Sequence, residues 1–98
     1  MTLPVVYLPE SRDDIDATYA RYETLRAGLG EAFAAALSKR VEEIRVNPAI
    51  YGLVATDVRA VPLRRFPYVV YYREEPNQVV ILAVQHGRRS ASIWQART

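Results

Sequence analysis

The stretch RRFPYVVYYREEPNQVVILAVQHGRR, from Arg64 to Arg89, decides how this chain folds. Its two apolar runs, 67–75 and 78–87, are rich in β-branched and aromatic residues, which favour β-strands. Between them lies the sequence EEPN, residues 74–77, whose proline and asparagine are typical of a tight turn. The stretch therefore predicts a β-hairpin with two arginines at each strand's outer end, so that four arginines lie near its open end.

Side-chain alternation assigns the faces of this hairpin. The second run is apolar on both faces, as expected for a central strand that is covered on both sides. In the first run and at the residue before it, alternation places Phe66, Tyr68, Val70 and Tyr72 on one face and Val69 and Tyr71 on the other. The preceding segment, 58–66, also alternates, but Pro62 cannot donate to a ladder. We therefore expect that segment to be an edge strand or to be bulged at the proline.

The amino-terminal half predicts one short strand and two helices. Residues 3–9 form a short apolar run bounded by prolines. Residues 10–28 have helical periodicity in Ile15, Tyr19, Tyr22 and either Leu25 or Arg26. Ser11 is the expected N-cap of this helix. The sequence Gly28-Leu29-Gly30 interrupts the periodicity and predicts a tight link to a second helix.

The second helix is predicted over residues 31–47, where Phe33, Leu37, Val41 and Ile44 form one apolar stripe that ends at Asn47-Pro48. Two helices joined by a short link should form an antiparallel hairpin. The predicted fold class is α+β, with an N-terminal helical hairpin packed on a small antiparallel β-sheet. We expect a single domain over residues 1–98, with residues 89–98 as a final helical turn or a tail.

Composition narrows the classes of function. The chain has 98 residues, a net charge of +2 and no cysteine, which excludes disulfides and thiolate metal sites. Residues 1–47 carry a charge of −2 and residues 48–98 a charge of +4, and twelve of the thirteen basic residues are arginines. No signal peptide or apolar membrane span is recognisable. We expect a cytoplasmic protein with no membrane partner, no metal and no cofactor.

Few residues can carry catalysis. His86 is the only histidine, and the adjacent acidic pairs Asp13/Asp14, Glu42/Glu43 and Glu74/Glu75 are interpreted as solvated charges because neighbouring side chains diverge. The carboxy-terminal half combines arginines with Tyr68, Tyr71, Tyr72 and Trp94. Arginines among aromatic residues are typical of polyanion surfaces and of protein interfaces.

The whole chain, from about Leu3 to Arg97, resembles the RelE/ParE family of small toxins from bacterial type II toxin–antitoxin pairs. The resemblance is carried by "YLPESRDDIDATYARYE", "LGEAFAAALSKRVEEIRVNP", "VRAVPLRRFPYVVYYR" and "VVILAVQHGRRSASIW". The last two segments are the specific ones. The resemblance implies a helical hairpin on a sheet, and a toxin that a cognate antitoxin protein neutralises in a hetero-oligomer.

The two branches of the family differ in function: RelE-like members cleave mRNA on the ribosome, and ParE-like members inhibit DNA gyrase. Compared with the nuclease branch, this chain has Tyr68 in place of an arginine and Trp94 in place of a tyrosine. The lysines before the hairpin are missing, since Lys39 is the only lysine. Only Arg88 is kept. The resemblance therefore favours a ParE-like gyrase inhibitor that is not an enzyme.

Two alternatives remain: a RelE-like ribosome-dependent endoribonuclease that acts on mRNA through His86, Arg88 and Trp94, or a detoxified module that only binds the antitoxin. The expected target surface comprises Arg64, Arg65, Arg88, Arg89 and Trp94, whereas Arg21 and Arg26 in the first helix are not expected to contribute. The expected antitoxin surface is an apolar groove along the helical hairpin and the adjoining sheet, with exposed parts of Tyr19, Tyr22, Phe33 and Leu37 as its contacts.

Overall fold

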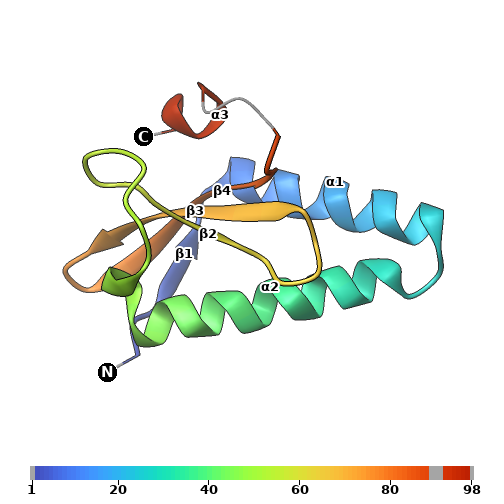
Figure 1. Ribbon diagram of the computed structural model, residues 1–98, viewed down its shortest axis with the longest axis horizontal. Helices are drawn as coiled ribbons and strands as arrows, with labels where there is room; N and C mark the ends of the chain where they lie inside the picture. The colour runs from blue at the N-terminus through green and yellow to red at the C-terminus, as the bar shows by residue number, and fades with distance from the viewer. Residues whose placement is uncertain (1, 89–91, 98) are drawn as a thin grey trace.

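The computed structural model describes residues 2–88 and 92–97. Its elements follow one another along the chain as β1 (Val5–Tyr7), α1 (Pro9–Leu25), α2 (Leu29–Val46), the 3-10 helix η1 (Pro48–Ile50), β2 (Arg59–Pro62), β3 (Tyr68–Glu75), β4 (Gln78–His86) and α3 (Ser92–Gln95). The strand order in the sheet is β1-β4-β3-β2. In Figure 1, α2 and α3 lie on opposite sides of the sheet, and α1 runs beside α2.

The predicted fold class is confirmed, and one feature of the sheet is corrected. β2, β3 and β4 pair antiparallel, with Glu75 opposite Gln78 beside the predicted turn. β1 instead pairs parallel to β4, so the sheet is mixed. A parallel pair needs a long crossover, and here the chain between Tyr7 and Gln78, which includes the helical hairpin, β2 and β3, provides it. As predicted, β2 is an edge strand that ends at Pro62, and β4 is central.

The larger core lies between the sheet and the helices. The predicted α2 stripe is confirmed, because Phe33, Leu37, Val41 and Ile44 are all buried there. From the sheet, the predicted face of β3 meets them with Tyr68, Val70 and Tyr72. The buried Tyr72 hydroxyl donates to the Pro48 carbonyl over 2.5 Å, and burial raises the pKa of Tyr72. The hydroxyl is thus satisfied inside the core.

A smaller core covers the other face of the sheet. It consists of Val58, Val80, Leu82, Ala83 and Trp94. The β3–β4 register shifts between Tyr71, which lies opposite Ala83, and Tyr72, which lies opposite Ile81. This bulge turns the adjacent residues Leu82 and Ala83 to the same face. β4 therefore contributes to both cores, as its apolar sequence predicted.

Two details of the helical hairpin differ from the expectation. α1 begins at Pro9, and Ser11 is not its N-cap: the Ser11 side chain is buried and donates to the Leu8 carbonyl over 2.7 Å. The link to α2 is stabilised by Glu23, whose carboxylate accepts the N–H groups of Gly28 and Gly30 at 2.9–3.2 Å. A Cβ at Gly30 would lie 2.8 Å from the Tyr19 carbonyl oxygen, so glycine lets the two helices meet there.

Candidate functional site

The open end of the β3–β4 hairpin brings together the two segments that carry the predicted arginines. Tyr68 pairs with His86 at the last position of the ladder, and the Gly87 N–H donates to the Pro67 carbonyl over 2.8 Å. Three of the predicted arginines, Arg64, Arg65 and Arg88, therefore lie at one end of the sheet. Arg89 lies outside the described residues.

The described arginines at this end face two different clefts. Arg64 and Arg65 line a cleft of about 290 Å³ against α2, whereas Arg88 lines one of about 450 Å³ against α1. The α2 cleft is lined by Ala32, Ala35, Ala36, Lys39, Arg40, Arg64 and Arg65. The lining of the α1 cleft includes Asp13, Asp14, Arg21, Tyr68, His86 and Arg88.

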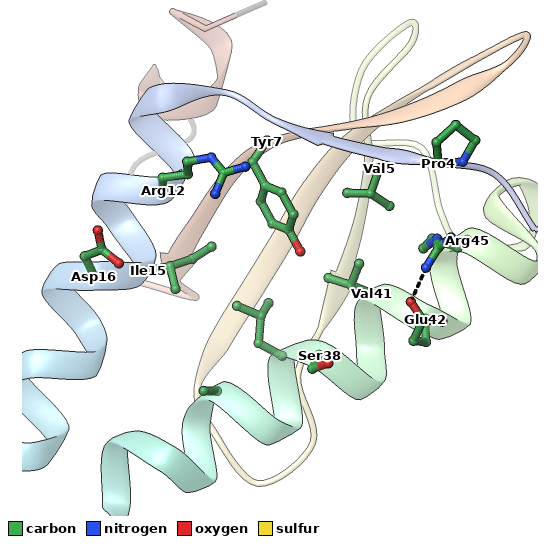
Figure 2. A pocket seen from close by; sticks show the side chains of 12 residues that line it. Pro4, Val5, Tyr7, Arg12, Ile15, Asp16, Ser38, Val41, Glu42 and Arg45 are labelled. Carbon is green, nitrogen blue, oxygen red and sulfur yellow. Dashed lines mark hydrogen bonds and ion pairs between the residues drawn. The ribbon is translucent and has the colours of Figure 1, made fainter.

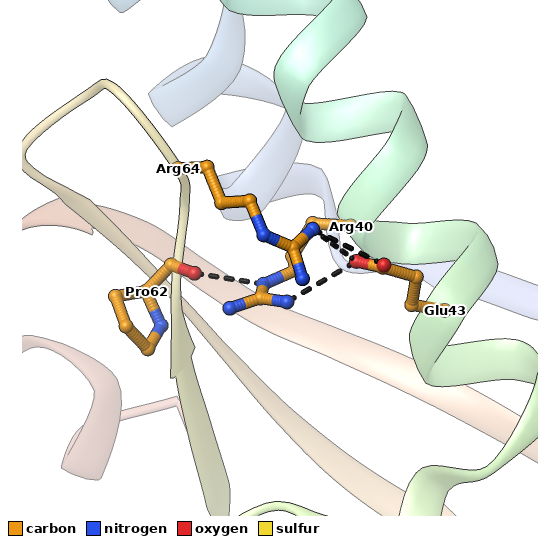
Figure 3. Close-up of polar contacts among 4 residues, drawn as sticks. All are labelled: Arg40, Glu43, Pro62 and Arg64. Carbon is orange, nitrogen blue, oxygen red and sulfur yellow. Dashed lines mark hydrogen bonds and ion pairs between the residues drawn. The ribbon is translucent and has the colours of Figure 1, made fainter.

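Glu43 holds two arginines at the α2 cleft (Figure 3). Its carboxylate accepts hydrogen bonds from Arg64 Nη1 at 3.0 and 3.1 Å and from Arg40 Nη1 at 3.1 Å. The hydrogen bond from Arg64 is the main cause of a lowered pKa of Glu43, and the bond from Arg40 lowers this pKa further. Arg40 Nε also donates to the Pro62 carbonyl over 2.8 Å and so ties α2 to the edge strand. Arg64 remains 57% exposed and accessible to a partner.

The α1 cleft contains an arginine that the sequence analysis did not expect there. Arg21 donates a hydrogen bond to the Tyr68 hydroxyl, and its guanidinium carbon lies 5.8 Å from the centre of the Tyr68 ring. Since a guanidinium can only donate, the Tyr68 oxygen accepts and its own proton remains available. Among the described residues, no carboxylate forms an ion pair with Arg21 or Arg88. Arg21 was missed because it meets Tyr68, 47 positions along the chain, only in the fold.

His86 lies at the end of β4 with one ring nitrogen engaged. Its Nδ1 accepts the Arg88 backbone N–H over 3.1 Å, which leaves Nε2 to carry the proton of the neutral ring. The ring contacts Tyr68 edge-on, with 5.5 Å between ring centres. The half-buried histidine therefore offers a donor at Nε2.

Trp94 occupies a different position from the one expected of a target contact. It is only 4% exposed, and its ring stacks on Tyr71 with 5.5 Å between ring centres. The short α3 helix thus places Trp94 in the smaller core, where the ring is covered in this structure. Strand alternation had placed Tyr71 on this face, but nothing in the sequence indicated its partner.

Asp14 is not the solvated charge that its sequence suggested. It is 10% exposed, and its two oxygens accept from the Arg97 guanidinium at 2.6 and 3.2 Å. Asp14 Oδ2 also accepts the backbone N–H of Val84 over 3.0 Å. The hydrogen bond that Arg97 donates to Asp14 raises the pKa of Arg97. The carboxylate joins α1 to β4 and to the segment after α3.

The predicted antitoxin contacts are distributed unevenly. Phe33 is fully buried beneath the sheet, so this residue cannot contact a partner while the core is intact. Tyr22 is half-buried among Phe33, Phe66 and Tyr68. Tyr19 lies on the helix surface and donates to the Glu31 carboxylate, a bond that raises the pKa of Tyr19 to about 12.

Leu37 lines the largest of the described hollows, a groove of about 690 Å³ between β1, α1 and α2 (Figure 2). Its apolar wall includes Val5, Ile15, Leu37 and Val41. The Arg12 guanidinium lies 5.1 Å from the centre of the Tyr7 ring at one side. We call this hollow the hairpin groove. It agrees with the predicted groove in place, but its lining includes β1 residues that the sequence analysis did not single out.

Two structural observations concern metals and membranes. Within residues 2–88 and 92–97, no group of three or more His, Asp or Glu side chains is arranged to hold a metal ion. In the same part of the chain, every helix is too short or too polar to cross a bilayer.

Comparison with known proteins identifies the family. The family model described as the ParE toxin of the type II toxin–antitoxin system parDE matches residues 5–91. A solved structure of the chromosomal ParDE toxin–antitoxin system from P. aeruginosa superposes with a TM-score of 0.76 at 19% identity, covering 87% of this chain and 96% of that one. A solved structure of the E. coli toxin RelE in the free state, with two arginines replaced by alanine, superposes with a TM-score of 0.65 at 17% identity. The match covers 99% of this chain and 94% of that one. A search of curated proteins gave no match. Because the ParE model spans most of its length, the chain belongs to the ParE/RelE family and is the toxin of a type II toxin–antitoxin system.

Proposed function

We propose that this protein is a ParE-like toxin that inhibits DNA gyrase by binding it, and that a cognate antitoxin neutralises it in a bacterial cytoplasm. The observation that favours a gyrase inhibitor over a RelE-like nuclease is the hydrogen bond at His86. RNA cleavage needs a group that removes a proton from the attacking hydroxyl. The Nδ1 of His86 already accepts the Arg88 N–H, so the ring nitrogen that would remove this proton is engaged.

The remaining positions support the same choice. Tyr68 stands where the nuclease branch has an arginine, and loss of a preorganised charge stabiliser costs a factor on the order of 10²–10³ in rate. Trp94 stands where that branch has a tyrosine, and its ring is buried against Tyr71. A binding toxin needs neither group in a catalytic position.

The proposed target surface is the arginine end of the hairpin, with Arg64, Arg65, Arg88 and Arg89. We leave out Trp94 because its ring is covered in this structure. Guanidinium groups recognise carboxylates and phosphates in a fixed geometry, and both occur in a complex of gyrase with DNA.

We propose the hairpin groove as the antitoxin site. An amphipathic segment could place apolar side chains against Leu37 and Val41 and its polar side near Arg12 and Arg45. The similar solved structure from P. aeruginosa is described as a ParDE system, which supports an antitoxin partner for this chain as well. Hydrogen exchange with and without the antitoxin tests this proposal, and unchanged protection across residues 5–45 contradicts it.

A gyrase supercoiling assay beside a ribosome-dependent mRNA cleavage assay tests the choice of target. We expect supercoiling to be blocked and mRNA to remain intact. Arg88→Ala should weaken gyrase inhibition and growth arrest, whereas Arg26→Ala should not. Both residues are exposed and lack ion pairs among the described residues, so the two variants remove the same charge.

The α1 cleft favours a second candidate, the RelE-like endoribonuclease. Its lining includes Arg21 and Arg88, which form no ion pair among the described residues, together with the Tyr68 hydroxyl, His86 and the exposed Asp13 carboxylate. Efficient mRNA cleavage by the wild type that disappears in His86→Ala would establish this candidate and reject ours. Absence of growth arrest without the antitoxin would instead indicate a detoxified, antitoxin-binding module.

A further inference from the structure

The segment before β3 presents two arginines between two fixed apolar side chains. Leu63 is buried, and its N–H donates to the Tyr68 carbonyl over 2.8 Å. Phe66 packs edge-on against Phe33 at 5.8 Å between ring centres. Arg64 and Arg65, between them, are exposed. A loop held at both sides loses little entropy when its exposed residues bind a partner.

Arg65 has an unusual backbone conformation. Its φ is +73°, and within the described residues no other non-glycine residue has a positive φ. An arginine in the left-handed region costs free energy that glycine or asparagine would largely avoid. Such strain is found where a side chain is needed in a particular place. Here it directs the loop so that Arg65 lines the α2 cleft.

The facing surface of α2 combines cations with small apolar residues. Lys39 is exposed and, like Arg65, forms no ion pair within the described part of the chain. Three alanines, Ala32, Ala35 and Ala36, provide a floor without bulky side chains. Within residues 2–88 and 92–97, Glu43 is the only carboxylate that forms an ion pair with the cleft's arginines, and it already binds both Arg40 and Arg64. The cleft therefore has an excess of positive charge around a small apolar floor.

We propose that the α2 cleft binds an acidic segment of a partner protein. Carboxylates match the guanidinium groups of Arg64 and Arg65, and small side chains of the same segment pack on the alanines. A polynucleotide would use the cations but not this floor, and no aromatic ring for base stacking lines the cleft among the described residues. The inference adds a partner chemistry to the proposed toxin function, and it does not depend on gyrase as the target.

Fluorescence anisotropy with a short capped peptide of repeated Glu-Ala-Ala-Ala tests the proposal on the full chain. The test variant combines Lys39→Ala with Arg65→Gly. Alanine favours the helix, and glycine favours the left-handed backbone, so both changes suit the fold. We expect the peptide Kd to rise roughly three- to thirtyfold, as for the loss of two surface ion pairs.

Arg26→Ala combined with Arg88→Ala is the charge-matched control and should change the Kd little. A second variant, Ala35→Gln, leaves the charge unchanged but blocks close approach to the floor, and it should also weaken binding. Equal weakening by the control, or no measurable peptide binding to the wild type, overturns the proposal. The proposal is also overturned if an oligonucleotide of equal charge binds more tightly than the peptide and loses its binding in the same variants. Supercoiling, measured separately, reports on gyrase alone.

Discussion

One face of the β1-β4-β3-β2 sheet lies against α1 and α2, of 17 and 18 residues, whereas the other lies under the four-residue α3. The first core is continuous from Phe33 to Ile44 along α2. The second depends on one tryptophan and on the Asp14–Arg97 ion pair that joins the chain after α3 to α1. The difference indicates that the helical hairpin carries the stability of the fold, and that the α3 side is held by a few replaceable contacts.

The largest effect is expected from Phe33→Ala. Its ring is fully buried and contacts Tyr22, Phe66 and Tyr68, so truncation leaves a cavity that the helices cannot close. We expect the free energy of unfolding to fall by about 3–5 kcal/mol. Urea denaturation followed by circular dichroism measures this, and a loss below that of Trp94→Ala would contradict the comparison of the two faces.

Asp14→Ala should have the next largest effect. The change leaves the Val84 N–H and the Arg97 guanidinium without their carboxylate, at a cost of about 2–4 kcal/mol. The neighbouring Asp13→Ala is the control, because Asp13 is exposed and should have little influence. If the ion pair accounts for most of the effect, the double variant Asp14→Ala/Arg97→Ala should lose little more free energy of unfolding than Asp14→Ala alone. A fully additive double variant would argue against that coupling.

Trp94→Ala should cost less, about 1–3 kcal/mol. Although the indole is buried, the short segment around it can detach and regain chain entropy instead of leaving a cavity. Native-state hydrogen exchange should show lost protection in residues 92–97 and little change along α2. Lost protection in α2 to the same extent would show that the two cores unfold together.

The smallest effect concerns pH and the Arg64–Glu43 bond. Since the pKa of Glu43 is lowered in the folded state, the stabilising contribution is fully present above about pH 4.5 and is lost as the pH falls through the lowered pKa. The melting temperatures of wild type and Arg64→Ala should therefore differ slightly at neutral pH and converge in acid. Arg26→Ala should show no such pH dependence. A difference that persists in acid would exclude Glu43 as its source.

Local patterns in the sequence predicted the elements well because their causes are local. The α2 stripe of Phe33, Leu37, Val41 and Ile44 is a consequence of helical periodicity, and the faces of β3 are a consequence of strand alternation. Pro62 placed β2 at the edge because it lacks a backbone N–H. The turn and the pairing of β3 with β4 follow from residues that are near one another in the chain.

By itself, the sequence determined the family, the helical hairpin, the central β4 and the arginine-rich end of the sheet. Only the tertiary structure decided which polar groups meet. Asp14 binds Arg97, which lies 83 positions away in the sequence, and Arg21 binds Tyr68, which lies 47 positions away. Periodicity in the sequence carries no information over such separations. The tertiary structure also decided three further features: the parallel pairing of β1, the burial of Trp94 and the division of the arginines between two clefts. Each depends on how the helices and α3 pack on the sheet, and packing is a property of the whole chain rather than of any one segment.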